Sequence, residues 1–129
     1  MLGAKINPLD FMEGVPPSFL FQCEDIEAVL YNTVMIPKHL ISIGAQAFSG
    51  TNWFNPILVS NNMLKMEEYC FASCQIIKMI INANNSLHID SYAFSDTSIG
   101  ELEFKTKPAN LYFCANVYTI DKLVLPITK

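Results

Sequence analysis

The feature that most constrains the fold is a repeat centred on a phenylalanine. Phe48, Phe71 and Phe94 are each 23 positions apart, and the nine residues that end at each of them align without gaps. Apolar residues also recur seven and five positions before each phenylalanine, as Ile41/Ile43, Leu64/Met66 and Leu87/Ile89. A period of this length is typical of proteins whose repeats stack into a solenoid. We therefore expect a chain that coils once per repeat.

A strand-like alternation of apolar and polar residues follows each phenylalanine. It covers residues 56–60, 78–82 and 101–105, and residues 33–37 and 122–126 carry the same pattern. Period-two alternation with β-branched residues indicates half-buried strands. Because Glu101 and Glu103 must face water, their neighbours Leu102 and Phe104 should face the core. The same register places these pairs inside: Val34/Ile36, Ile57/Val59, Met79/Ile81 and Leu123/Leu125.

These patterns predict a mainly β fold, a solenoid with a parallel sheet and short helical or irregular returns that carry the phenylalanines. One coil cannot bury its own apolar face, so stacked coils should form a ladder of the three phenylalanine rings. Asn61-Asn62 and Asn84-Asn85 fall where the chain must turn, a role that suits Asn because it tolerates left-handed backbone. Each coil is expected to contain about 23 residues.

The length of 129 residues predicts a single domain, 1–129. Residues 32–106 hold the regular repeats. Residues 1–31 do not fit them cleanly, because Pro16-Pro17 interrupts the pattern. A degenerate coil containing Phe21 and Cys23, or a short helix that caps the first coil, would both suit this segment. Residues 107–129 are expected to form an irregular last repeat and a final strand, because Phe113 follows Phe94 by only 19 positions.

The repeat unit also has a characteristic order of residues. Ile36-Pro37 is followed at positions 41–50 by the run Ile-Ser-Ile-Gly-Ala-Gln-Ala-Phe-Ser-Gly. Segments 69–74 and 92–95 each match a part of this run. This order resembles the BspA-like (Treponema-type) leucine-rich repeats, although Glu67 and Asp90 stand where that family's motif has Gly. The resemblance spans about residues 33–126. It implies a leucine-rich-repeat solenoid, surface recognition and adhesion roles as in bacteria and protists, and no catalytic residues; such repeats also occur in phage proteins.

Composition and charge exclude several classes of protein. A net charge of −4 argues against a nucleic-acid surface, which needs a basic patch. The apolar runs are too short to span a bilayer, and residues 1–10 lack the apolar stretch of a secretory signal. We therefore expect no membrane insertion and a cytoplasmic or virion-associated location, with a surface role only by a route that this sequence does not show. Without signs of secretion, the cysteines should be reduced thiols without a metal, namely Cys23, Cys70, Cys74 and Cys114.

The sequence offers little for catalysis. Glu67-Glu68 is expected to be a solvated turn, since neighbouring carboxylates point in different directions. His88, between inward Leu87 and Ile89, should point outward in a row with Ser42 and Lys65. No phosphate-binding loop, nucleophile elbow or zinc motif is present. We therefore expect a protein that is not an enzyme and needs no cofactor.

The outer face of the strands is the candidate interaction site. Its expected partner-binding residues are the strand-centre side chains and two flanking lysines: Met35, Leu58, Ile80, Glu103, Val124, Lys78 and Lys122. An apolar spine with a polar rim is typical of a protein interface. A terminal segment that folds over this face, or apolar residues without a role, would give the same pattern.

The expected function is a non-catalytic protein-binding or adhesion module. The alternative is a structural, decoration or adhesin component of a phage or virus particle. Its partner would be a protein or a second copy, bound through the sheet face or through the C-terminal edge. Residues 122–126 show no cap after them, and an uncovered strand edge favours pairing with another chain.

Overall fold

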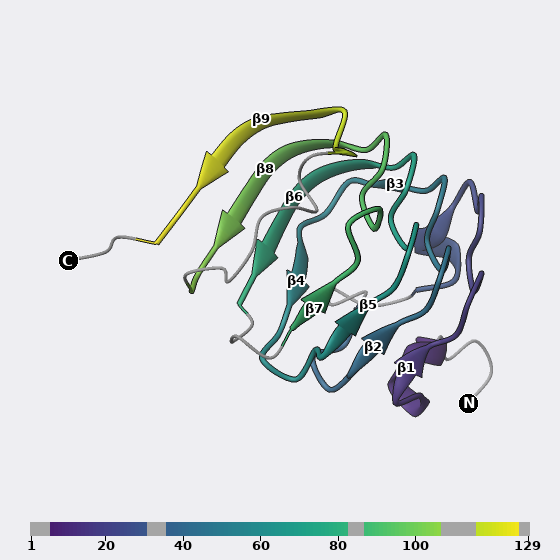
Figure 1. Cartoon of the computed structure of the whole chain (residues 1–129). Coiled ribbons are helices and arrows are strands. Elements are labelled where there is room, and N and C mark those ends of the chain that lie inside the picture. Colours follow the sequence, from purple (N-terminus) through teal and green to yellow (C-terminus); the bar gives the residue numbers. More distant parts are fainter. Residues whose placement is uncertain (1–5, 31–35, 83–86, 107–115, 127–129) are drawn as a thin grey trace.

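The computed structural model describes residues 6–30, 36–82, 87–106 and 116–126, in which the chain winds between two parallel sheets (Figure 1). The first sheet has the order β1-β2-β5-β7, and its strands are Gly14–Val15, Ser42–Ile43, Lys65–Met66 and His88–Ile89. The second sheet has the order β3-β6-β8-β9, and β4 also pairs with β6. Its strands are β3 (Asn52–Trp53), β4 (Ile57–Val59), β6 (Gln75–Ile81), β8 (Ser98–Phe104) and β9 (Thr119–Val124).

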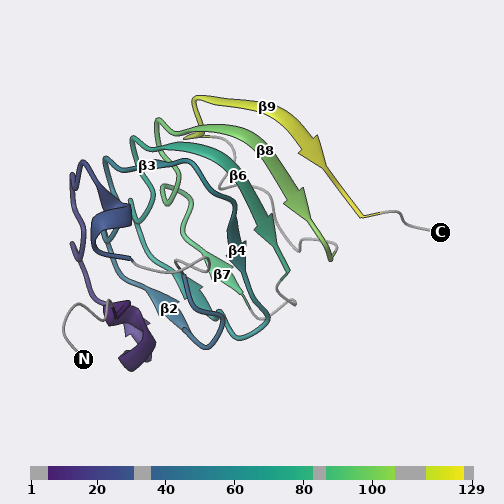
Figure 2. The ribbon, with the colours of Figure 1, turned by 180° about the vertical axis from the view of Figure 1, so that it is seen from behind.

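The two sheets face each other across one core, and the coils follow one another from the N-terminal to the C-terminal end of the molecule (Figures 1 and 2). Strand pairing confirms the repeat, because Ser42, Lys65 and His88 lie in register, as do Gln75 and Ser98. The predicted mainly β solenoid is therefore confirmed. The apolar residues that recur before each phenylalanine lie in short strands, and the pairing of these strands into a sheet of their own was not predicted from the sequence.

The returns that carry the phenylalanines are turns, not helices, in the described residues. Two 3-10 helices, η1 (Pro8–Phe11) and η2 (Ile26–Ala28), precede the first regular coil. η1 begins at Asn7, whose side-chain oxygen accepts the Leu9 backbone N–H at 2.9 Å. Leu9 is fully buried and belongs to the core cluster, so η1 packs onto the N-terminal end of the stack.

The phenylalanine ladder lies at the centre of the core. The rings of Phe48 and Phe71 are stacked with centroids 5.3 Å apart, and those of Phe71 and Phe94 are 5.5 Å apart and almost parallel. Trp53 contacts Phe48 edge-on at 5.2 Å. All four rings are buried. The predicted aromatic ladder is confirmed, and each such pair stabilises the fold by about 0.5–1.5 kcal/mol beyond the area that it buries.

The strands of the second sheet contribute the other half of the core. As predicted, the pairs Ile57/Val59, Met79/Ile81 and Leu102/Phe104 are buried, and so is Ile36. Val34 lies outside the described residues. Leu123 faces inward as predicted, in register with buried Leu102, but the expected burial of Leu123 and Leu125 was wrong, since they are 46% and 49% exposed. β9 pairs only with β8 in the described part of the chain, so no further coil covers these two side chains there.

The strands of the second sheet begin earlier than the alternation indicated. β6 begins at Gln75 and β8 at Ser98, each three residues before the predicted segment. In β6 the buried residues Ile76 and Met79 are three positions apart, so two consecutive side chains between them, Ile77 and Lys78, face outward at a bend. Period-two alternation fails at such a bend, and the sequence pattern therefore showed only the second half of each strand.

The N-terminal segment contains a coil of the same kind, centred on Leu20. The Leu20 N–H donates to a carbonyl of the next coil at 2.7 Å, as the Phe48 N–H does at 2.8 Å. Ser18 and Gln22, two positions on either side, have the positive φ values that also flank Phe48. Pro16-Pro17 does not interrupt the coil as expected, because it lies where Gly44-Ala45 lies in the next coil. Leu20 precedes Phe48 by 28 positions, and η2 lies in the longer return of this coil.

The turns at the opposite side use Asn differently from the prediction. Asn61-Asn62 does lie in a turn, but its backbone is not left-handed. The Asn62 side chain instead donates to the Lys38 carbonyl of the preceding coil at 2.9 Å, and the Ser60 hydroxyl donates to the same oxygen. Asn therefore ties neighbouring coils together here. Asn84-Asn85 lies outside the described residues.

The last coil is shorter than the others. In β6 and β8, Gln75 pairs with Ser98, which lies 23 positions further along the chain, whereas Ser98 pairs with Thr119 after only 21 positions. Most of the residues between β8 and β9, including Phe113, lie outside the described residues. The last repeat is therefore irregular in length, as expected. Its strand β9 nevertheless pairs in register with β8, and the paired positions are two residues closer in the sequence than those of β6 and β8.

A column of small polar side chains runs beside the phenylalanines. Thr51, Cys74 and Thr97 each follow a phenylalanine by three positions and are buried. The Cys74 thiol donates to the Phe48 carbonyl at 3.0 Å, and the Thr97 hydroxyl donates to the Phe71 carbonyl. Each of these bonds satisfies a carbonyl of the preceding coil, which water cannot reach in the core.

The described cysteines, Cys23, Cys70 and Cys74, are free thiols. Burial raises the pKa of both Cys70 and Cys74, since a thiolate is costly to place away from water. Both thiols are therefore protonated at neutral pH and serve as small core residues. Cys114 lies outside the described residues.

Candidate interaction face of the second sheet

The structure brings most of the predicted partner-binding residues into two rows on the outer face of the second sheet. Leu58, Ile80, Glu103 and Val124 are paired in register across β4, β6, β8 and β9. Two positions earlier along the strands, Lys78 and Lys122 pair with the same residue, Glu101. Met35 lies outside the described residues. The expected alignment of these side chains is thus present, while their role in binding stays a prediction.

The apolar side chains gather at the β3, β4 and β6 end of this face. Leu58 is 43% exposed and its register partner Ile80 is half-buried. Sequence reasoning missed two further residues of this region, Ile77 on β6 (55% exposed) and Phe54 directly after β3 (69% exposed). We call these four residues the apolar patch. The recurrence of Phe54 and Ile77 at the repeat period was the available signal, but both precede the segments in which alternation was visible.

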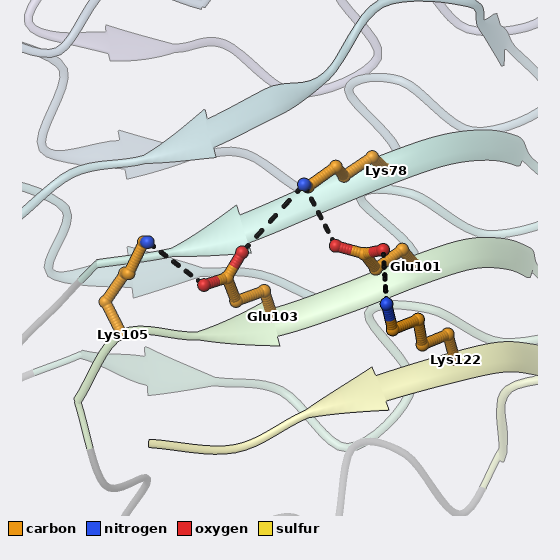
Figure 3. A network of polar contacts seen from close by, with 5 residues as sticks. All are labelled: Lys78, Glu101, Glu103, Lys105 and Lys122. Carbon is orange, nitrogen blue, oxygen red and sulfur yellow. Dashed lines mark ion pairs between the residues drawn. The ribbon is translucent and has the colours of Figure 1, made fainter. Parts of the chain in front are cut away.

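Ion pairs cover the β6, β8 and β9 part of the face (Figure 3). Lys78 Nζ lies 2.9 Å from a Glu101 oxygen and 3.9 Å from a Glu103 oxygen. Lys122 Nζ approaches the other Glu101 oxygen at 3.7 Å, and Lys105 Nζ lies 3.0 Å from Glu103. The charges therefore alternate across the three strands. Glu103, the one polar residue among the expected strand-centre positions, lies between two lysines.

These contacts shift the pKa values of Lys78 and Glu101. A hydrogen bond from Lys78 holds the pKa of the Glu101 carboxyl below its usual value, and the nearby charges of Lys78 and Lys122 act in the same direction. The hydrogen bond to Glu101 raises the pKa of Lys78 in turn. Both groups are charged at neutral pH. The outer face therefore has an apolar end and an end of paired charges.

The outer face of the first sheet holds a shallow hollow lined by Ala45, Lys65, Met66, Glu67, Glu68, His88 and Asp90. His88 is exposed and in register with Ser42 and Lys65, as predicted. Glu67 is not free for acid–base chemistry, because it accepts the Ala45 N–H at 3.2 Å and pairs with Lys65 at 3.0 Å. The hollow thus contains structural contacts between coils.

Two other site types have no support in the described ranges. No cluster of three or more His, Cys, Asp or Glu side chains suited to a metal ion occurs in the described residues. Likewise, none of the helices within those ranges has the length and apolar character needed to cross a bilayer. His39, the second histidine, uses its Nε2 in a 2.9 Å hydrogen bond with the Met12 carbonyl.

Stacked coils with a parallel sheet on each side and a ladder of phenylalanines define a repeat protein of the solenoid class. The family model of the BspA type leucine rich repeat region (6 copies) matches residues 19–128. The chain belongs to this family, as the resemblance of its repeat unit predicted. The match begins beside Leu20, at the centre of the N-terminal coil. No curated protein and no solved structure matches the chain.

Proposed function

We propose that this chain is a non-catalytic module that binds another protein through the outer face of its second sheet. The observation that carries the proposal is the apolar patch, in which large apolar side chains lie exposed on neighbouring strands of a parallel sheet. Repeats of this family typically mediate protein interactions and lack catalytic residues. Complete transfer of a Leu or Ile side chain out of water contributes about 1.5–3 kcal/mol, and each half-buried residue of the patch would contribute the share that corresponds to its exposed part.

The charged row beside the patch supports the same function. Lys78 and Glu101 neutralise each other at the border of the patch, so a partner does not have to desolvate an isolated charge there. Lys105 and Lys122 are more exposed and carry charge at the rim, where charged groups guide encounter more than they add affinity. We therefore expect a partner with an apolar centre and acidic groups on one side.

The test is affinity capture with the intact chain, followed by measurement of the affinity for each captured protein after purification. Leu58→Glu and Ile80→Glu place a charge in the patch and should each weaken binding at least tenfold. Leu64→Glu is the matched control, because Leu64 is exposed to a similar extent, 48% against 43% for Leu58, but lies beside the first sheet. It should leave binding unchanged.

Equal affinity of the wild type, Leu58→Glu and Ile80→Glu proteins for every partner would refute the proposed face. The stoichiometry of the complex separates this function from a structural role. A fixed, high copy number of the chain relative to its partners would indicate a component of a larger particle, whereas a recognition module should bind its partner in a small, defined ratio.

A further inference from the structure

Strand β9 has one paired edge and one edge that pairs with no strand of the described residues. Its residues from Thr119 to Val124 pair with β8. Leu123 points inward beside Leu102, yet it is 46% exposed while Leu102 is completely buried. Tyr118, just before the strand, is 75% exposed. The stack therefore ends, within the described residues, on a strand whose backbone and inner side chains are available to another chain.

The bend of the second sheet sets which way the β9 side chains point. In β8 the buried residues Ile99 and Leu102 are three positions apart, with two outward positions between them. Their register partners in β9 are Ile120 and Leu123, so Asp121 and Lys122 both lie at the bend and face outward. Val124 is paired with outward Glu103.

This order of inward and outward positions reads the same in both directions along β9. The register with β8 gives the order out, in, out, out, in, out from Thr119 to Val124. In an antiparallel pair, residues directly opposite each other share a face of the sheet. Two copies of β9 related by a twofold axis at the bend would meet this requirement at every position. Ile120 would lie opposite Leu123 of the second copy, and Asp121 opposite Lys122 of the second copy.

We propose that two copies of this chain associate through their β9 strands, paired antiparallel about an axis between Asp121 and Lys122. The symmetry gives two opposite-charge pairs from one adjacent acid and base. A second copy is favoured over an unrelated partner because both the charges and the inward apolar residues of β9 complement themselves. Such self-complementary contact is what a twofold dimer requires.

Lys122 is free to take part in this pairing. Its side chain is 68% exposed, and its contact with Glu101 is long, at 3.7 Å. In the dimer it would lie between Glu101 of its own chain and Asp121 of the second copy. The apolar patch lies on β3, β4 and β6, beyond β8 from this edge. The dimer would therefore present two patches and could bind a repetitive partner with higher avidity than one chain.

The test is a charge swap measured by light scattering and analytical ultracentrifugation on the intact chain. Wild type should associate to twice the chain mass of 14.5 kDa. Asp121→Lys places two lysine pairs across the axis, and Lys122→Asp places two aspartate pairs there. Each single variant should weaken association by at least tenfold. The double variant Asp121→Lys/Lys122→Asp restores opposite charges and should dimerise like wild type.

A mixture of the two single variants gives the sharpest result. One chain then carries lysine at both positions of the axis, and the other chain carries aspartate at both, so every pair across the axis joins opposite charges. The mixture should form heterodimers although neither variant forms homodimers. The cost of placing an aspartate beside Glu101 is the same in monomer and dimer, so it does not mimic this result. A wild type that stays monomeric at high concentration would refute the proposal, and so would dimers that are insensitive to the swaps.

Hydrogen exchange on the unmodified chain provides a second measurement that needs no variant. Amides of β9 should become more protected as the protein concentration rises, while those of β3 and β4 should not change. Protection that is independent of concentration in β9 would contradict the proposal. Leu58→Glu should leave the dimer mass unchanged, so the failure of this inference and the failure of the proposed binding face can be distinguished.

Discussion

Phe71 is the residue on which the stack of coils most depends. Its ring lies between those of Phe48 and Phe94, and it also meets Trp53 edge-on at 5.8 Å. It is completely buried. Removal of a central ring leaves a cavity bounded by side chains of three coils, and these cannot collapse onto it without breaking the strand register.

We expect Phe71→Ala to lower the free energy of unfolding by about 3–5 kcal/mol, a large part of the ~5–15 kcal/mol available to a domain. Urea denaturation followed by circular dichroism measures this loss. Phe54→Ala is the matched control, because Phe54 is 69% exposed, and its effect should stay within about 0.5 kcal/mol. Equal losses in the two variants would contradict the assignment of Phe71 to the centre of the core.

The surroundings of Gly44 also explain why the equivalent positions of later coils lack the glycine of the family's motif. Gly44, Glu67 and Asp90 follow the paired residues of β2, β5 and β7 and occupy equivalent positions. A Cβ on Gly44 would lie 2.6 Å from the backbone nitrogen of Pro17, so only glycine fits beside the N-terminal coil. Glu67 lies next to Gly44 of the preceding coil, which has no side chain. The Glu67 side chain therefore has room there, and it accepts the Ala45 N–H. The motif glycine is thus needed only where the backbone of the preceding coil is close.

At the scale of elements, β6, β8 and β9 act together through the row formed by Lys78, Glu101 and Lys122. The row depends on strand register, because Glu101 reaches one lysine on each neighbouring strand. The folded-state pKa of Glu101 is lowered, so its contribution to stability is present above the unfolded pKa and is lost as the pH falls through the folded pKa.

Lys78→Met should raise the pKa of Glu101 towards its ordinary value, since the hydrogen bond from Lys78 is the largest cause of the shift. Carboxyl chemical shifts in an NMR pH titration measure this directly. Lys65→Met serves as the control, because Lys65 pairs with Glu67 beside the first sheet. A Glu101 that titrates at the same pH in wild type and Lys78→Met would show that the row does not form in solution.

At the scale of the whole molecule, the coils are not equally stable. In a solenoid each coil contacts only its neighbours, so stability depends on being flanked on both sides. β6 lies between β4 and β8 and contributes buried Ile76, Met79 and Ile81. β9 is flanked by β8 alone in the described residues, and Leu123 is half-exposed. Local opening should therefore begin at the β9 end.

Hydrogen exchange at low protein concentration, where association is negligible, should show this gradient. Amides of β6 should exchange slowest and those of β9 fastest, with β8 between them, because a strand opens more easily when fewer apolar contacts hold it. Mass spectrometry of peptides from the three strands measures the rates. Uniform exchange in all three would indicate that the described residues unfold as one cooperative unit.

The period, the phenylalanine ladder and the inward face of most strands could be predicted from the amino-acid order alone. Each of these follows from local spacing, since stacked coils of equal length bring equivalent residues together. The same reasoning found the row of Leu58, Ile80 and Glu103 on the outer face. It also identified the family, because the order of residues in one coil is itself the family's signature.

Features that depend on neighbouring coils could be seen only in the three-dimensional structure. The structure showed that the short strands before the phenylalanines pair with one another as the first sheet, that the N-terminal segment holds a coil around Leu20, and that the last coil pairs two positions earlier than the coil before it. The structure also placed Phe54 and Ile77 on the outer face. These two residues were not predicted because they precede the segments in which the period-two alternation is visible. The exposure of Leu123 could not be predicted from the alternation of apolar and polar residues in its strand. Burial of an inward side chain also depends on whether another coil packs against that strand, and this is a property of the whole stack.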